Sequence, residues 1–463
     1  MSVRILHYSD IENATDDPQR IGRLTRCLRD HRDDRTLVCG TGDTTSPGLL
    51  SIETGGEHAH RFFEAADPDF SVPGNHDFDS GVDRFRDIAA ESPQTWLIAN
   101  LADGDRPVAH DLGVRATAVT TVGTERVGFV GVTDPGTLAD HVTSGELTVT
   151  DPVAAAEDAV ADLPSDLDYV VVLSHAGSRD DDIARIDRVD MVLGGHDHER
   201  RADTVAETPV AHPGERGERL TEAELTGEGA TATLHDVTEY PVAEDVAGTY
   251  RELFTELGLN EMLTDVDSPV GRDRNDRYPE TPIGNFVVDS IRWAADADVA
   301  VVHPLMLRSG PPLEETVSVG DVRSTTPFDN DLHSTCLDGD ELVALFESLA
   351  SPEFLELDAE VYGHVSGATL SWRRDDDGLE LLEATVDGER PDATESYTVA
   401  APSLEFISDG LYPVLTEECI EVDHGSQHDA LVGHAREQGI DSEIDGRMQV
   451  ASDTASGEFR SLR

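Results

Sequence analysis

In the first half of the chain, up to about residue 211, apolar and polar residues follow two different patterns. Short apolar runs recur, and the segments between them carry apolar residues at helical spacing, for example Leu24, Cys27 and Leu28. This alternation predicts an α/β domain. The expected strands are 3–8, 36–40, 69–73, 95–100, 127–132, 168–174 and 190–195, and the expected helices include 18–31 and 153–163.

The pattern changes in the second half. A segment rich in Gly, Glu and Thr, 214–237, predicts edge strands and turns, and a helix is expected over 246–257. Further on, the expected helices are 284–295 and 339–349, and the expected strands are 298–304, 369–374, 381–387 and 396–402. We therefore expect an α/β domain over 1–243, a linker helix or hinge over 244–268, and an α+β domain over 269–463.

The charge balance indicates an unusual solvent. The 463 residues include 95 Asp plus Glu against 34 basic residues, all of them Arg, for a formal net charge of −61. Such a surface repels itself in dilute buffer, whereas molar salt shortens the Debye length to roughly 3 Å and screens the repulsion. A halophile-like, salt-rich cytoplasm is the expected location. The acidic residues are interleaved with apolar runs, which argues against a disordered chain.

Other compositional signals exclude several partners. No basic stripe is present to follow a nucleic-acid backbone. No apolar run approaches the ~18 residues that span a bilayer, and the start does not resemble a signal peptide. The cysteines, which lack CxxC spacing, are Cys27, Cys39, Cys336 and Cys419. We expect neither a nucleic-acid partner nor a membrane, and neither a disulfide framework nor a zinc knuckle.

Residues with metal-binding side chains follow five of the expected strands. Any one of them would more often be a turn or capping residue. Ligands of α/β sheets bind beyond the carboxyl ends of the strands, so together these side chains predict one metal centre. The candidates are Asp10, Glu12, Asp43, Asn75, His175, His196 and His198. Oxygen and nitrogen donors without thiolate suit Mn²⁺, Zn²⁺, Fe²⁺ or Mg²⁺, and their number suits two ions, which favours phosphoester hydrolysis.

These motifs resemble a known family. The segments LHYSDIEN, GNHDFD, VVLSHAG and GGHDH are similar to those of calcineurin-like metallophosphoesterases, specifically the 5′-nucleotidase branch. The resemblance implies a four-layer, two-sheet αββα sandwich followed by a smaller α+β domain that binds substrate. It implies one ion held by Asp10, Asp43 and His198, and a second held by Asp43, Asn75, His175 and His196.

The GNHDFD turn would carry the acid–base chemistry. By the same resemblance, His76 is not a ligand but stabilises the transition state or protonates the leaving group, and Asp79 orients it. We expect Asp77 to stabilise the turn. The first motif departs from the family pattern, because Glu12 stands where the family has His. Glu12 either ligates and shifts the site toward Mn²⁺ or Mg²⁺, or faces solvent.

The second half resembles the C-terminal domain of 5′-nucleotidases, through Gly284-Asn285-Phe286 and the segment 317–347. In that family, arginines bind phosphate and two Phe rings stack on the base. The implied substrate-binding residues, with Asn100 added from the first domain, are Asn100, Arg272, Arg274, Arg277, Arg308, Phe328, Phe406 and Asp409. As alternatives to substrate binding, the arginines could form ion pairs at the surface and the Phe rings could lie in the core. The segments HPLMLRS (303–309) and SLEFISDG (403–410) depart from the family, which puts the substrate in question.

The predicted function is that of a dinuclear metal-dependent phosphomonoesterase acting on nucleoside 5′-monophosphates or similar small esters. Mn²⁺ is the favoured ion, with Zn²⁺, Co²⁺, Fe²⁺ and Mg²⁺ as alternatives. A 2′,3′-cyclic nucleotide phosphodiesterase or another metabolite phosphatase is the alternative enzyme. A nucleotide-binding or metal-binding module without catalysis is the alternative outside enzymes, and either a monomer or a homodimer is expected.

Overall fold

The structure, a computed structural model, describes residues 2–104, 106–134, 147–272, 279–328, 330–351, 361–375, 378–408, 411–441 and 443–452. The chain divides into two compact units, Met1–Leu257 and Gly258–Arg463. This division falls inside the segment 244–268 that the sequence predicts as a linker or hinge.

The first unit contains two six-stranded sheets with parallel centres; both edges of the second sheet and one edge of the first are antiparallel, whereas β4, the other edge of the first sheet, is parallel to β3. In order, the first sheet consists of β15 (Gly229–Asp236), β14 (Arg219–Thr226), β1 (Val3–Tyr8), β2 (Thr36–Thr41), β3 (Phe70–Val72) and β4 (Thr95–Trp96). The second consists of β12 (Arg200–Val205), β13 (Thr208–Pro213), β11 (Met191–Gly194), β10 (Tyr169–His175), β8 (Glu125–Thr133) and β7 (Thr117–Val122). The segment 214–237 contains the hairpin β14–β15. β15 is an edge strand, as the sequence predicts, whereas β14 pairs with both β15 and β1.

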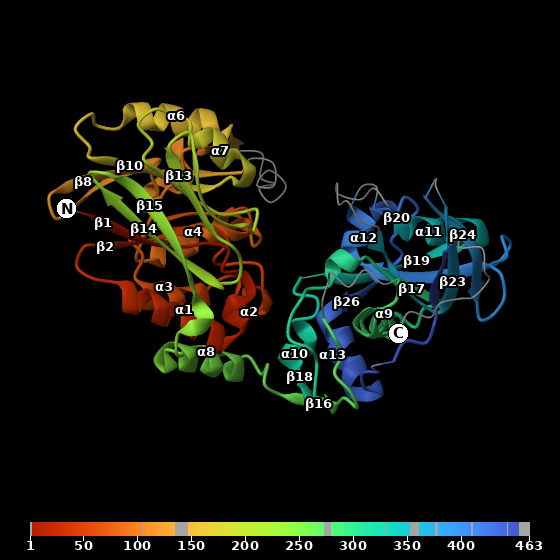
Figure 1. Cartoon of the computed structure of the whole chain (residues 1–463). Helices are drawn as coiled ribbons and strands as arrows, with labels where there is room; N and C mark the ends of the chain where they lie inside the picture. Colours follow the sequence, from red (N-terminus) through yellow and green to blue (C-terminus); the bar gives the residue numbers. More distant parts are fainter. Residues whose placement is uncertain are drawn as a thin grey trace. The chain divides into compact units, whose positions relative to one another are not determined.

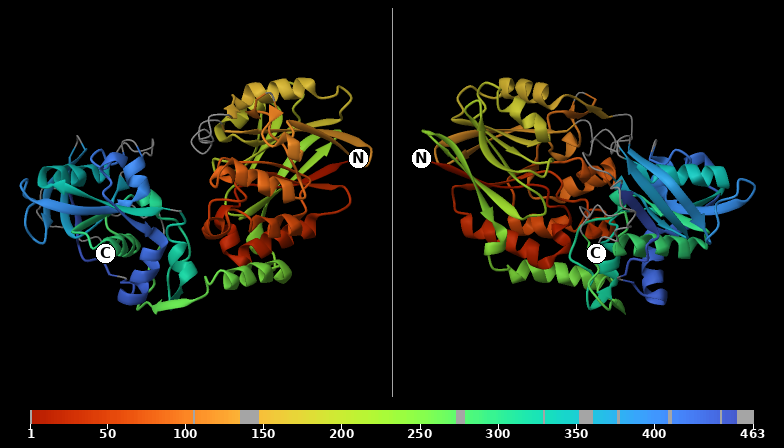
Figure 2. Two further views of the ribbon diagram at one scale, coloured as in Figure 1. Left: turned by 180° about the vertical axis from the view of Figure 1, so that it is seen from behind. Right: turned by 45° about the vertical axis from the view of Figure 1, so that its right-hand side comes forward.

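Helices cover the outer faces of this sandwich (Figures 1 and 2). They are α1 (Pro18–His31), α2 (Leu49–Thr54), α3 (Ala59–Ala66), α4 (Val82–Glu91), α6 (Pro152–Asp162), α7 (Asp180–Ile183) and α8 (Glu244–Glu256). The helices α1 and α8 lie on the side of the first sheet, and α6 lies on the side of the second. Within the described ranges, no helix has both the length and the apolar character that a membrane crossing requires.

The strand β10 shows why four layers form. Val171 and Leu173 join the core between the two sheets, whereas Val170 and Val172 join the core beneath α6. Successive strand residues point to opposite faces, so a strand that is apolar at every position must be covered on both sides. The αββα sandwich is therefore confirmed.

Local signals explain the helix α1, which spans the predicted range 18–31. Asp17 caps its N-terminus by accepting hydrogen bonds from the backbone amides of Gln19 (2.9 Å) and Arg20 (3.3 Å). Pro18 occupies the first turn, where its missing amide proton costs nothing. The apolar side chains at helical spacing, including Leu24 and Leu28, are buried.

The predicted strand 95–100 is wrong after Trp96. Its backbone amides change partners: Leu97 donates to Ser71 of β3, Ile98 donates to Arg115, and Ala99 donates to Gly131 of β8. The segment thus crosses from the first sheet to the second instead of extending β4. It is apolar because it passes through the core between the sheets, which a periodicity argument cannot distinguish from a strand.

The second unit is α+β, as expected. One sheet consists of β22 (His364–Ser366), β17 (Val299–Val302), β25 (Ser396–Pro402), β19 (Asp331–Asp338) and β26 (Val422–Ser426), and another of β24 (Gly378–Val386), β23 (Ala368–Asp375) and β27 (Met448–Ser452). A short pair joins β16 (Met262–Asp265) to β18 (Thr316–Ser318). The helices are α9 (Pro282–Ala295), α10 (Val319–Arg323), α11 (Gly339–Ser348), α12 (Ser403–Ile407) and α13 (Gln427–Gln438). Trp372 and Phe346 lie in the core of this unit.

Candidate metal centre

The predicted metal ligands follow the carboxyl ends of strands in both sheets of the first unit. The strands β1, β2 and β3 run parallel in the first sheet, and β10 and β11 run parallel in the second. In chain order, the residues at or just after these ends are Asp10, Glu12, Asp43, Asn75, His175, His196 and His198. The centre is therefore built from two stacked sheets, not from one open sheet.

The backbone at these strand ends is strained. Five of the seven candidates have a positive φ: Asp10 (48°), Glu12 (47°), Asp43 (48°), His196 (85°) and His198 (56°). Residues other than glycine avoid this region, at a cost of about 1–3 kcal/mol each, and such strain gathers where function requires a particular side-chain position. Turn chemistry alone does not account for the positive φ of Glu12, because Glu is not among the residues that favour this region.

Glycines allow the strand ends to approach one another. An added Cβ on Gly74 would lie 2.1 Å from Oδ1 of Asp43, and one on Gly195 would lie 2.6 Å from Oδ2 of Asp10. Both distances are far below a van der Waals contact, so any larger residue would displace these carboxylates. The two glycines thus leave room for the carboxylates at the centre.

The side chains form two overlapping groups of possible ligands. One comprises Asp10, Asp43 and His175, and the other comprises Asp10, Glu12 and His198. In the first group, Nε2 of His175 lies 3.0 Å from Oδ2 of Asp43. In the second, Nε2 of His198 lies 2.9 Å from Oε1 of Glu12 and 3.6 Å from Oδ1 of Asp10. Glu12 is only 9% exposed and does not face solvent.

His196 and Asn75 border these groups. The ring of His196 lies 5.0 Å from that of His175, centroid to centroid, and its backbone amide donates to Oδ1 of Asp10 (3.2 Å). Oδ1 of Asn75 is buried and accepts no hydrogen bond within the described part of the chain. An unsatisfied buried oxygen costs about 1–3 kcal/mol, and a bound cation would remove that cost.

The electrostatics of the centre also fit a cation. Burial raises the pKa of Asp10 to about 7, against the opposing charge of His175. Burial disfavours the imidazolium of His175, but Asp43 outweighs it and raises the pKa of His175 to about 10. A proton on His175 thus compensates the buried carboxylate of Asp43. Metal ions replace such protons when they bind, so the residues present fit a metal centre.

Several partners hold the candidate ligands in place. Oγ of Ser9 donates to Oδ2 of Asp10 (2.5 Å), and Nδ1 of His175 lies 2.7 Å from the carbonyl oxygen of Thr41. Nδ1 of His198 lies 3.4 Å from Oε2 of Glu215. Partners of this kind orient metal ligands. Sequence reasoning missed Glu215 because it lies in the loop between β13 and β14, beyond the last motif.

Asp77 stabilises the turn, as predicted, and also joins two strand ends. Its Oδ2 accepts hydrogen bonds from the amides of Asp43 (3.0 Å) and Gly74 (2.8 Å). Its Oδ1 accepts from the amides of Thr44 (3.1 Å) and Thr45 (2.9 Å). The carboxylate therefore binds the loop after β2 to the turn after β3.

His76 and Asp79 lie at the edge of the centre. Nδ1 of His76 lies 3.1 Å from both carboxylate oxygens of Asp79, and Oγ of Ser46 donates to Oδ2 of Asp79 (2.6 Å). The backbone amide of His76 donates to Oδ1 of Asp43 (2.9 Å). Burial lowers the pKa of His76, but Asp43 and Asp79 outweigh it and raise the pKa to about 9. This geometry suits an imidazole oriented by a carboxylate.

Three predicted substrate residues lie together in the second unit. The guanidinium of Arg272 donates to Oγ of Ser324 (2.9 Å) and to the carbonyl oxygen of Arg308 (3.5 Å). The guanidinium of Arg308 lies over the ring of Phe328, 4.7 Å from its centroid. Arg272 is buried, so its guanidinium supports the backbone here.

The other predicted substrate residues differ in placement. The buried amide of Asn100 donates to the carbonyl oxygens of Thr133 (2.8 Å) and Thr150 (3.1 Å) and accepts from the amide of Thr133 (3.0 Å). Phe406 is 3% exposed and belongs to the core of the second unit. Both side chains have structural roles here, and any contact with substrate stays a prediction. Arg274, Arg277 and Asp409 lie outside the described residues.

Two family models match the chain, one in each unit. Residues 3–200 match the model of calcineurin-like phosphoesterases, and residues 262–417 match that of the 5′-nucleotidase C-terminal domain. The chain belongs to the calcineurin-like phosphoesterases with a 5′-nucleotidase C-terminal domain. The family resemblance of the sequence motifs is confirmed for both units.

The chain is similar to one curated relative over part of its length and to two solved structures over nearly all of theirs. A 5′-nucleotidase from Diplobatis ommata is 30% identical over 171 residues, which cover 36% of this chain and 30% of that protein. The chain thus spans less than a third of that relative. The 5′-nucleotidase precursor of Thermus thermophilus has the same fold, with a TM-score of 0.75, 21% identity, and coverage of 97% of this chain and 99% of that one. A sulfate thiohydrolase from the same genus has a TM-score of 0.69 at 18% identity, covering 99% and 97%.

Replacing Asp77 tests whether the strand ends must be joined. In Asp77→Asn, one of the two acceptor oxygens becomes an NH₂ group that faces backbone amides, so the loop carrying Asp43 should move. We expect metal affinity to fall about 10–100-fold, as for other partners that orient ligands, and the unfolding temperature to drop. Isothermal titration with Mn²⁺ measures the affinity. Asp87→Asn, at an exposed position of α4, should change neither value; unchanged affinity in a folded Asp77→Asn protein would refute this role.

Replacing Glu12 tests the departure from the family pattern. Glu12→His exchanges a hard oxygen donor for a nitrogen donor, so the ratio of Zn²⁺ to Mn²⁺ affinity should rise, in the direction expected for a softer ligand. Competition titrations of both metals measure this ratio. The exposed substitution Glu91→His should leave it unchanged, and an unaltered ratio in Glu12→His would show that Glu12 is not a ligand.

Proposed function

We propose that the protein is a dinuclear metal-dependent phosphomonoesterase that hydrolyses nucleoside 5′-monophosphates. The observation that carries this proposal is the convergence of the strand ends: Asp10, Asp43 and His175 lie within ligand distance of one another beside the His76–Asp79 pair. Membership of the calcineurin-like phosphoesterases supports the same reaction class.

The proposed ligand sets follow the family resemblance, with Glu12, which departs from the family pattern, added to the first set. Asp10, Glu12, Asp43 and His198 would hold one ion, and Asp43, Asn75, His175 and His196 the other. Two divalent ions supply charge stabilisation and an activated water for in-line attack on phosphorus. Mn²⁺ is favoured because Glu12 adds an oxygen donor, with Zn²⁺, Co²⁺, Fe²⁺ and Mg²⁺ as alternatives.

His76 would donate the proton that the leaving alkoxide requires. Asp79 accepts from Nδ1 and keeps one proton on that nitrogen. Because the pKa of His76 is raised to about 9, Nε2 also carries a proton at neutral pH, and this proton would pass to the leaving alkoxide. The hydrogen bond from Ser46 to Asp79 holds the carboxylate in position. The His76 amide bound to Asp43 fixes the turn relative to the metal ligands.

Substrate choice depends on the second unit. Arg308 and Phe328 offer a cation and an aromatic ring, which suit a phosphate and a base. Phe406, however, lies in the core, which leaves the second expected stacking ring without a surface. This observation favours the second candidate, a phosphatase for another small metabolite without a base. The 2′,3′-cyclic nucleotide phosphodiesterase is an alternative that the missing ring does not favour, because its substrate carries the same base. The fold does not identify the substrate, because a sulfate thiohydrolase has the same fold.

A hydrolysis screen separates these candidates. Nucleoside 5′-monophosphates, 2′,3′-cyclic nucleotides and sugar phosphates are incubated in molar KCl with Mn²⁺, Zn²⁺, Co²⁺, Fe²⁺ or Mg²⁺. Release of inorganic phosphate is measured for the monoesters, and the ring-opened monophosphate is detected by chromatography for the 2′,3′-cyclic nucleotides, whose hydrolysis frees no phosphate. Preference for the 5′-monophosphates supports the proposal, hydrolysis only of the sugar phosphates favours the second candidate, and hydrolysis only of the cyclic nucleotides favours the phosphodiesterase. Binding of a nucleotide without any hydrolysis would indicate a binding module. Cytoplasmic location and a monomeric or homodimeric state stay predictions.

The role of His76 has its own test. His76→Ala should lower kcat by about 10²–10⁴, the range for loss of a general acid, while the number of bound metal ions stays the same. Asp79→Asn should cause a smaller loss, because the imidazole remains. The exposed substitution His110→Ala controls for the loss of a histidine. A fully active His76→Ala protein would contradict the proposed acid.

A further inference from the structure

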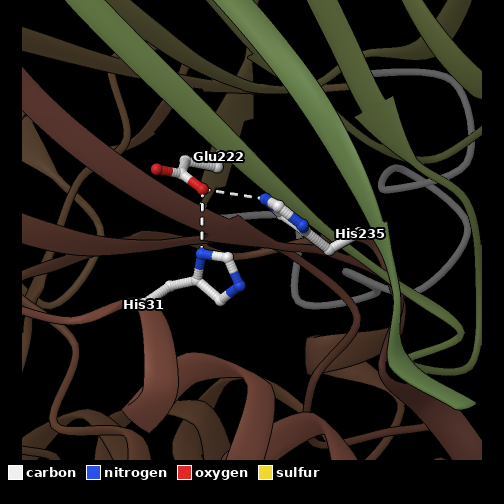
Figure 3. A group of neighbouring side chains, drawn as sticks. All are labelled: His31, Glu222 and His235. Carbon is white, nitrogen blue, oxygen red and sulfur yellow. Dashed lines mark hydrogen bonds and ion pairs between the residues drawn. The ribbon is translucent and has the colours of Figure 1, made fainter. Parts of the chain in front are cut away.

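A second cluster of metal-binding side chains lies in the first unit, outside the candidate metal centre (Figure 3). It comprises His31 at the end of α1, Glu222 on β14 and His235 on β15. One ligand atom of each residue lies within 4.8 Å of the other two. None of the three belongs to the family motifs or to the proposed phosphoesterase site.

The three side chains face one point. Nδ1 of His31 lies 2.9 Å from Oε2 of Glu222, and Nε2 of His235 lies 2.8 Å from the same oxygen. In Figure 3, dashed lines join one carboxylate oxygen of Glu222 to one nitrogen of each ring. The ring centroids of His31 and His235 are 4.1 Å apart. Two nitrogens and one oxygen thus converge from three different elements.

Neighbouring groups complete an outer layer. Nε2 of His31 lies 2.7 Å from the hydroxyl of Tyr240, which fixes the ring and leaves Nδ1 for a ligand. The guanidinium of Arg4 lies 2.8 Å from Oε1 of Glu222, which leaves Oε2 for a ligand. Metal-ligating imidazoles and carboxylates have partners of this kind on their other atoms.

The cluster lies on the outer face of the first sheet, on the side that α1 covers. Along β14, Glu222 and Glu224 alternate with Ala223 and Leu225. The side chains of Ala223 and Leu225 point into the core between the sheets. Glu222 therefore points the opposite way, toward α1. The side chains of His31, Glu222 and His235 are 23%, 19% and 21% exposed, so water can reach the cluster and complete a coordination shell.

We propose that His31, Glu222 and His235 bind one divalent transition-metal ion of the Zn²⁺ class. Two imidazoles and one carboxylate suit Zn²⁺, and imidazole is a poor ligand for Mg²⁺ or Ca²⁺. The ion would fasten the end of α1 to the hairpin β14–β15, whose strand β15 is an edge of the sheet. Its role is structural, because no further His, Cys, Asp or Glu within the described part of the chain joins the three side chains.

Zinc stoichiometry tests the site. The full-length protein is dialysed against Zn²⁺ in molar KCl, and bound zinc per chain is measured for the wild type and for His235→Gln. Gln retains a donor toward Glu222 but is a poor zinc ligand. We expect His235→Gln to bind one ion fewer per chain, with phosphate release unchanged. The exposed substitution His110→Gln should bind as many ions as the wild type.

Stability gives an independent readout. Zn²⁺ should raise the unfolding temperature of the wild type more than that of His235→Gln or of Glu222→Gln, because the ion joins elements that separate on unfolding. Equal stoichiometry and equal zinc-induced shifts in all folded variants would overturn the proposal. The cluster would then be an ion pair of imidazoles with Glu222. Because the readouts are zinc binding and stability, failure here leaves the proposed hydrolase unaffected.

Discussion

The burial of two carboxylates side by side is the constraint on which the first unit depends. Asp10 and Asp43 are 0% and 1% exposed, and charges removed from water are costly unless they are paired. Imidazoles from the second sheet provide this pairing, because His175 lies against Asp43 and His198 against Asp10. The two sheets are therefore linked by charge compensation at their strand ends as well as by the apolar core between them.

This constraint explains the local backbone. The strand ends can meet only if glycine stands where a Cβ would strike a carboxylate, as Gly74 and Gly195 do. Five of the seven candidate ligands then adopt positive φ values, which residues other than glycine seldom adopt. The carboxylate of Asp77, which accepts hydrogen bonds from two loops, helps to offset this strain. The strained backbone at the centre is thus held in place by the hydrogen bonds around it.

Periodicity predicted those parts of the fold whose environment is uniform along the element. The helix 18–31 and the strand 396–402 have the predicted bounds. The helix buries one apolar face along its length, and the strand pairs with β19 from Ser396 to Pro402. The segment 95–100 failed because it changes sheets midway. Motifs located the candidate ligands, since each follows a strand. The sequence motifs did not identify Glu215, Glu222 or His235. These residues meet residues distant in the sequence only through tertiary packing, which spacing along the chain does not encode.

In a chain with 95 acidic residues, carboxylates gather by chance, so their number does not identify a metal site. Burial, imidazole and backbone strain discriminate better. The candidate metal centre has all three features. The cluster of His31, Glu222 and His235 has two imidazoles and partial burial, but none of its residues has a positive φ. A catalytic centre must hold its ligands against strain to fit a transition state, whereas a structural ion needs only ligands already placed by regular elements. The different backbones thus match the different roles proposed for the two sites.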